Sequence, residues 1–119
     1  MEAKAYRWTE IAPDRPIALL TRRMVKGESI MAARVLLEKG CQVATHSHPS
    51  EQLAMVMSGR VRWTIGAEGD PDRRELEMGG GEAIMLPSNI LHAVEALEDT
   101  EIIDILSPPG AMGVDSQAH

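Results

Sequence analysis

Aromatic residues are scarce in this chain, which contains two Trp, one Tyr and no Phe. The core must therefore be built from Leu, Ile, Val, Ala and eight Met, whose flexible side chains fill irregular gaps. Cysteine is equally rare: Cys41 stands alone, which excludes a disulfide framework within the chain. The 119 residues suffice for one domain with one continuous core, and we expect a single domain over residues 1–119.

Basic clusters and long apolar runs are also missing. The net charge is −6, and the longest basic clusters are the pairs Arg22-Arg23 and Arg73-Arg74, which argues against nucleic acid or an anionic membrane as a partner. No apolar stretch approaches the roughly 18 residues that a membrane span needs. Residues 1–15 lack the apolar region of a signal peptide. These absences predict a soluble cytoplasmic protein, and they leave an anionic small substrate open if a few arginines are placed locally.

Short apolar segments separated by Gly, Pro and polar turns recur along the chain, and no helical period extends beyond about two turns. This pattern predicts an all-β sandwich or barrel with its core in about residues 15–107. The Pro- and Gly-containing tail, residues 108–119, is expected to be flexible and loosely held. The expected strands cover residues 17–24, 29–37, 42–48, 52–57, 61–65, 74–78, 83–86, 93–97 and 101–106.

The strongest chemical signal is a pair of histidines, His46 and His48, separated by one residue. Alternate side chains of a strand share a face, so His46, His48 and Gln52 would point the same way and Glu51 the opposite way. Imidazole nitrogens and an amide oxygen can together bind a divalent metal. Three interpretations stay open at this point: a metal-free core pair held by hydrogen bonds, a closed structural metal site, and a metal site with exchangeable positions.

Two segments around these residues resemble the paired motifs of the cupin superfamily. The first has the form Gly-x5-His-x-His-x3-Gln-x6-Gly and runs from Gly40 to Gly59. The second has the form Gly-x5-Pro-x-Asn-x2-His and runs from Gly81 to His92. The resemblance implies a cupin-type double-stranded β-helix, which is a small jelly-roll barrel open at one end with one divalent metal ion inside.

The ligands that this resemblance implies are His46, His48, Gln52 and His92. Gln52 stands where a Glu is commoner in the family, so all four ligands would be neutral. An uncompensated metal charge favours polarisation of a bound oxygen or capture of an anionic ligand. The ligand types do not distinguish Zn, Ni, Fe, Mn and Cu.

Two charged residues interrupt apolar strands and are candidates for the site. Asp104 lies among Ile and Leu residues, and an inward Asp104 near the metal could act as a general acid or base. The alternative is a structural partner for an arginine such as Arg34 or Arg23. Arg34 either lines the barrel, where it would bind a substrate carboxylate, or lies at a surface edge.

Residues 104–109, together with the run from His48 to Gln52, are similar to small single-domain cupins of the uronate-linearising type known as KdgF. That resemblance implies a metal-assisted isomerisation or ring opening of a small sugar acid. In the family segment an aromatic ring and an arginine stand where this chain has Leu106 and Gly110. The alternatives are a metal-dependent dioxygenase and a non-catalytic module that binds a small carboxylate. The resemblance to cupins also implies a homodimer, and the doubly apolar strands fit an outer sheet face that is buried against a partner.

Overall fold

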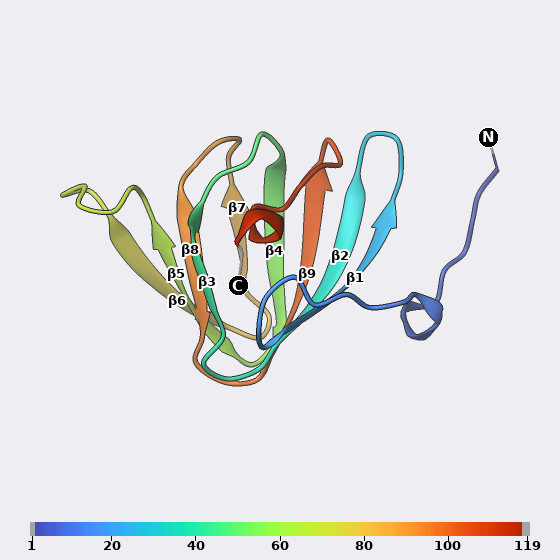
Figure 1. The fold of residues 1–119 in the computed structure, drawn as a ribbon, viewed down its shortest axis with the longest axis horizontal. Helices are drawn as coiled ribbons and strands as arrows, with labels where there is room; N and C mark the ends of the chain where they lie inside the picture. Colours follow the sequence, from blue (N-terminus) through green and yellow to red (C-terminus); the bar gives the residue numbers. More distant parts are fainter. Residues whose placement is uncertain (1, 118–119) are drawn as a thin grey trace.

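The computed structural model describes residues 2–117, and in this part of the chain nine strands form two antiparallel sheets. One sheet has the strand order β1-β2-β9-β4-β7 and the other the order β3-β8-β5-β6. Figure 1 shows the two sheets facing each other and diverging toward one end. The strands are β1 (Leu20–Lys26), β2 (Met31–Leu37), β3 (Gln42–His46), β4 (Glu51–Ser58), β5 (Arg60–Ile65), β6 (Arg74–Gly79), β7 (Ala83–Leu86), β8 (His92–Ala96) and β9 (Thr100–Ser107).

The predicted all-β jelly-roll architecture is confirmed, and each expected strand is present; β7 has the expected bounds, and the other strands differ by one to three residues at one or both ends. β1 begins three residues late because residues 17–19 form a turn, in which Leu19 has a φ of 66°. β3 ends at His46 instead of residue 48, and Pro49, which has no N–H to donate, follows soon after. The described part of the chain contains no helix long and apolar enough to span a bilayer.

Strand alternation places the core between the two sheets. Along β2 the buried positions are Met31, Ala33, Val35 and Leu37, and the residues between them face outward. β9 follows the same period, with Asp104 at one of its buried positions. A one-residue slip would turn every buried side chain of a strand to the outer face, so the registers of the long strands are well determined.

The segment from 108 to 117, here called the C-terminal strap, is packed against the barrel and differs in this from the expected loose tail. Met112 and Val114 are buried in the core, the latter at the start of the short helix η2 (Val114–Ser116). The side-chain amide of Gln117 donates to the carbonyl of Ala44 and accepts from its N–H, at 2.9 and 3.0 Å. Residues 118–119 of the expected tail lie outside the described residues.

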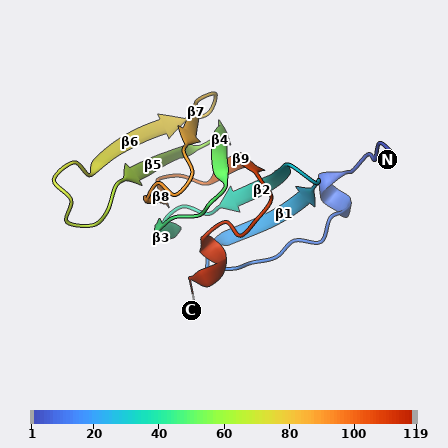
Figure 2. The same ribbon diagram turned by 90° about the horizontal axis from the view of Figure 1, so that it is seen from above.

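The strap bridges the edge strands of the two sheets. It contacts β3 through Gln117 and β1 through an ion pair between Asp115 and Arg22. In Figures 1 and 2 the red C-terminal segment leaves β9 and lies between the two sheets, near β3 and β1. The side-chain amide of Gln117 pairs with the main chain of Ala44 as a neighbouring strand would, and so covers main-chain groups on the edge of β3.

Two turn glycines with nearly equal φ values allow the packing around the β4–β5 turn to be tested. Gly59 and Gly40 have φ values of +89° and +90°. A Cβ on Gly59 would collide with the carbonyl oxygen of Asp99 and lie 2.7 Å from Cα of Thr100, whereas a Cβ on Gly40 meets nothing within 4 Å. We predict that Gly40→Ala lowers the free energy of unfolding by about 1–2 kcal/mol through backbone strain alone.

Gly59→Ala is expected to add a steric cost of roughly 1–3 kcal/mol to that strain. Urea denaturation of both variants measures the difference directly. Equal losses in the two variants would show that the β4–β5 turn has room for a side chain and would contradict the packing described.

Candidate metal centre

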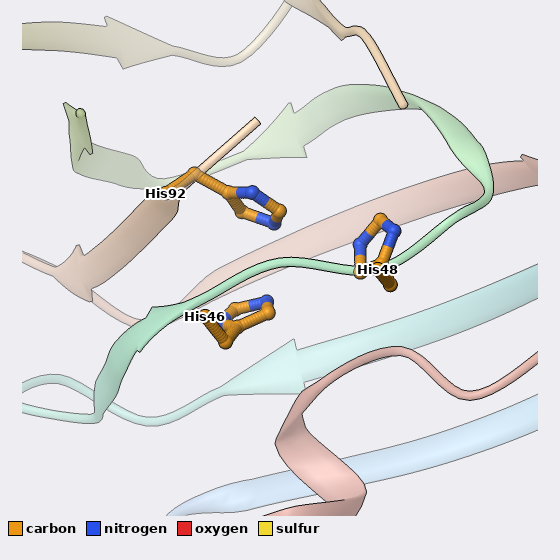
Figure 3. Close-up of side chains that lie close together, drawn as sticks. All are labelled: His46, His48 and His92. Carbon is orange, nitrogen blue, oxygen red and sulfur yellow. The ribbon is translucent and has the colours of Figure 1, made fainter. Parts of the chain in front are cut away.

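Three histidines from different parts of the chain meet between the sheets. His46 is the last residue of β3, His92 is the first residue of β8, and the two are paired across the strands. His48 lies in the connection between β3 and β4. One ring nitrogen of each lies within 4.8 Å of those of the other two, and Figure 3 shows the three rings turned toward a common point. The grouping could hold a metal ion.

The histidine rings are oriented by the main chain. In each ring Nδ1 lies within hydrogen-bond distance of a carbonyl two residues away, so Nδ1 carries the proton and donates it. Each Nε2 therefore keeps its lone pair, and these are the nitrogens left to face one another. The acceptors for His46, His48 and His92 are the carbonyls of Ala44, Ser50 and Ile90, at 2.7, 2.9 and 2.9 Å.

The residues present fit a cation better than a metal-free hydrogen-bonded core. His48 Nε2 lies 2.9 Å from Oε1 of Gln52. With Gln52 Nε2 donating to Asp104, both atoms of that contact are acceptors and neither offers a proton. A cation would satisfy all of these lone pairs together.

His46, His48 and Gln52 were expected on one face of a single strand. The structure brings them together from separate elements instead. His48 lies beyond the end of β3, and Gln52 lies on β4, which belongs to the other sheet. The parity argument holds within β4, where Gln52 is buried and Glu51 exposed. That the three histidines and Gln52 are metal ligands stays a prediction.

Burial keeps two of the histidines, His92 and His46, in the neutral form that can bind metal. It lowers the pKa of His92 to about 4, against the main-chain hydrogen bond to Ile90, which raises it. Burial likewise lowers the pKa of His46, partly offset by the hydrogen bond to Ala44. Both rings are therefore neutral near pH 7, and a neutral imidazole is the metal-binding species.

Asp104 faces inward and is joined to the histidines through Gln52. Gln52 Nε2 donates to Asp104 Oδ1 at 2.8 Å, and both side chains are buried. Burial raises the pKa of Asp104 to about 7, although the hydrogen bond from Gln52 opposes the shift. A carboxyl group with such a pKa can both give and take a proton near neutral pH.

Arg34 is not part of this site. Its neighbours Ala33 and Val35 face the core, so strand parity turns Arg34 to the outer face of β2, where its Nε donates to Glu101 at 3.1 Å. The surface alternative considered for Arg34 is therefore the one that the structure shows. An ion pair on the outer face leaves it no route into the barrel.

Arg22 is the charged residue that sequence reasoning missed. It lies at an inward position of β1, is 4% exposed, and lines a cavity of about 40 Å³ together with His46, His92 and Asp104. The sequence did contain a signal for an inward Arg22, because it alternates along the strand with the apolar residues Leu20 and Met24. The adjacent Arg23 concealed that signal, because the pair looks like an exposed basic cluster.

Comparison with known proteins identifies relatives of this chain. The family model described as "Cupin domain" matches residues 33–106, a range that includes the histidines, Gln52 and Asp104. No curated protein matches the chain.

Solved structures with a similar fold include an RmlC-like cupin from Shewanella frigidimarina, with a TM-score of 0.79 and 18% identity over 91% of this chain and 93% of that one. KdgF from Halomonas sp. has a TM-score of 0.80 and 22% identity over 92% and 96% of the two chains. Oxalate decarboxylase from Bacillus subtilis has a TM-score of 0.76 and 20% identity over 86% of this chain, which spans only 28% of that protein. At these identities the likeness establishes the fold.

The raised pKa of Asp104 makes a prediction about stability in the metal-free protein. The folded state has a pKa of about 7 against an ordinary value of 3.8, so between these values it holds a proton that the unfolded state has released. Stability is therefore lost as the pH rises through this window. Asp104→Asn removes the effect, and its melting temperature relative to the parent should rise steadily from pH 5 to pH 8.

Thermal unfolding in EDTA measures this difference. Asp72→Asn, in the exposed loop between β5 and β6, removes a carboxylate without burial and serves as the control, with a difference from the parent that does not change with pH. A pH-independent difference for Asp104→Asn as well would contradict a protonated, buried carboxyl group.

Proposed function

Because this chain belongs to the cupin domain family, we propose that it is a metal-dependent enzyme that isomerises or ring-opens a small sugar acid. The observation that carries this proposal is the placement of Asp104 in the same cavity as the histidine cluster, with a pKa near neutrality. A proton-transferring carboxyl group beside a Lewis acid is the minimal machinery for moving a proton next to a carbonyl or hydroxyl oxygen.

The proposed ligands are His46, His48, His92 and Gln52, around one divalent ion that is Zn, Ni, Fe, Mn or Cu. When bound, the ion supplies Lewis acidity toward a substrate oxygen. The four protein ligands are neutral, so they leave the positive charge available for an anionic or oxygen-rich substrate. The carbonyls that accept from each Nδ1–H hold the rings in place and increase the basicity of the ligating nitrogen.

Asp104 is the proposed acid and base. Its Oδ1 accepts from Gln52, which holds the carboxyl group at a set distance from the histidines. Burial of Asp104 strengthens its interaction with substrate, because charges interact more strongly in a low-dielectric site. The proton it takes from one substrate atom can be returned to another without release to solvent.

The similarity to KdgF supports a uronate as the substrate class, since the two chains match over almost their full lengths. We therefore predict that metal-loaded protein accelerates the loss of the ultraviolet absorbance of a 4,5-unsaturated uronate, and that EDTA abolishes this activity. Asp104→Asn should lower kcat by roughly 10²–10⁴-fold, as is typical for loss of a general acid or base. Glu101→Gln, on the outer face of the same strand, is the matched control and should leave kcat unchanged.

The outcomes separate this proposal from its alternatives. Oxygen consumption with a redox-active metal, and no uronate conversion, would favour a dioxygenase. A ligand-induced rise in melting temperature without turnover of any kind would favour a carboxylate-binding module. An Asp104→Asn variant as active as the parent would remove Asp104 from the mechanism.

We also propose that a second copy of the chain covers the outer face of the larger sheet. Paired outward positions of β4 and β9 there carry apolar side chains, and Met85 beside them on β7 is 53% exposed. Such a contiguous apolar surface is typical of homodimer interfaces. The side chains concerned are Leu53, Met55, Met85, Ile103 and Ile105.

Ile105→Glu should weaken this dimer at least about 100-fold, because an unpaired carboxylate would be buried at the interface. Sedimentation velocity over a concentration series measures the change. Thr64→Glu, on the outer face of the other sheet, is the control and should leave the association constant unaltered. A parent protein that stays monomeric at high concentration would contradict the assignment of this face.

A further inference from the structure

Arg22 is a buried cation inside the barrel, and the site described above does not use it. It is 4% exposed and lines the same cavity as His46, His92 and Asp104. A buried guanidinium is tolerated only when carboxylates compensate its charge and its N–H groups have acceptors. The carboxylates that bind Arg22 therefore indicate which ligand group it could accept.

Two aspartates divide the guanidinium between them. Asp14 accepts from Nε and Nη2 at 3.0 and 2.8 Å, and Asp115 accepts from Nη1 and Nη2 at 3.1 and 2.6 Å. Each aspartate thus binds one edge of the guanidinium with both carboxylate oxygens, which is the strongest arrangement for such pairs.

The two aspartates are not equivalent. Asp14 is fixed, because its main chain also pairs with that of Arg22 through two hydrogen bonds of 2.9 Å. Asp115 belongs to the C-terminal strap and is 39% exposed at its side chain, so it can reach solvent without crossing the core. If Asp115 left, Asp14 would keep Arg22 in place and the Nη1–Nη2 edge would be free to bind another carboxylate.

The strap occupies space beside the histidines. Met112 and Val114 form part of the cavity wall, and a Cβ on Gly113 would collide with the ring of His46. With the strap in this position the cavity has a volume of about 40 Å³, whereas a single water molecule already needs roughly 10–15 Å³. A few waters fit, and a sugar acid does not.

Unlike the Arg22 guanidinium, one buried donor on the cavity wall has no partner. The indole N–H of Trp63 is buried and has no hydrogen-bond acceptor among residues 2–117, although Trp63 borders the same cavity. An oxygen-rich ligand that enters when the strap moves would offer it an acceptor. Buried donors without partners are rare in folded proteins and call for such an explanation.

From these contacts we propose that Arg22 is the carboxylate-binding residue of this site, and that Asp115 is an internal carboxylate which occupies it until an acidic substrate takes its place. The inference rests on the proposed function only for the choice of a sugar acid as the ligand. Substrate binding and strap release are then coupled, since the substrate carboxylate and Asp115 compete for the same edge of Arg22. The apparent affinity of the parent is reduced by the fraction of molecules in which the strap is closed.

The test compares binding of galacturonate and of galactose, which lacks the carboxylate, by calorimetry to the parent and to Asp115→Asn. Asparagine keeps an oxygen to accept from the main-chain N–H of Met112, as Asp115 does, but removes the charge that competes for Arg22. We expect Asp115→Asn to bind galacturonate roughly tenfold more tightly than the parent, with no gain for galactose. Asp72→Asn, which changes net charge equally, should behave as the parent.

A second substitution assigns the gain to Arg22. Arg22→Lys in the Asp115→Asn background keeps the positive charge but loses the bidentate edge, and should return galacturonate affinity to the parent level or below. Equal affinity of Asp115→Asn and the parent, or a gain that survives Arg22→Lys, would overturn the proposal. If the double variant does not fold, amide hydrogen exchange of the parent tests the proposal instead. Saturating galacturonate should accelerate exchange in residues 112–117, and unchanged exchange would overturn the proposal.

Each titration is run with metal-loaded protein and again in EDTA, which separates this inference from the proposed function. A gain for Asp115→Asn in EDTA supports the role of Arg22 even if no metal binds and no uronate is converted. Metal binding and uronate turnover without any gain would leave the proposed function intact and remove the role of Arg22.

Discussion

The lone pairs of three imidazole nitrogens, two of them on buried rings, are the constraint on which the rest of this structure depends. Each histidine donates its Nδ1 proton to a main-chain carbonyl two residues away, so the Nε2 atoms converge without donors of their own. Such a grouping of lone pairs could hold a metal ion. The cross-strand pairing of β3 with β8 and the ending of β3 at His46 place the rings in it.

Polar groups deeper in the barrel are tolerated because they form a continuous chain from the histidines. Gln52 lies next to His48 through its oxygen and donates to Asp104 through its nitrogen. Asp104 has no cation in contact with it in the described structure, and its burial keeps the proton near neutral pH. The same low-dielectric interior therefore lowers the pKa of His46 and His92 and raises that of Asp104, so that burial favours the neutral form of each group.

The open side of the barrel presents a different problem, because β1 and β3 are edge strands of separate sheets. The C-terminal strap joins them with an ion pair on one side and a side-chain amide on the other. Closing the barrel in this way also fills most of the space beside the histidines. The strap and a ligand would occupy the same volume. The ion pair of Asp115 with Arg22 is partly exposed, and under our proposal it is the contact that breaks when a ligand enters.

Much of this protein was determined by its sequence alone: the strands follow from local alternation and turn residues, and the motif spacing identified the histidines, Gln52 and the cupin fold. These signals are local, since side-chain direction repeats every two residues within a strand. The tertiary structure decided what depends on contacts between distant segments. It placed β3 and β4 in different sheets, and it turned Arg34 outward and Arg22 inward. It also packed the strap against the barrel, where Asp115 meets Arg22 across 93 residues of sequence. No local pattern could reveal which of several arginines meets a carboxylate, because burial of a charge is settled by the partner that the fold brings to it.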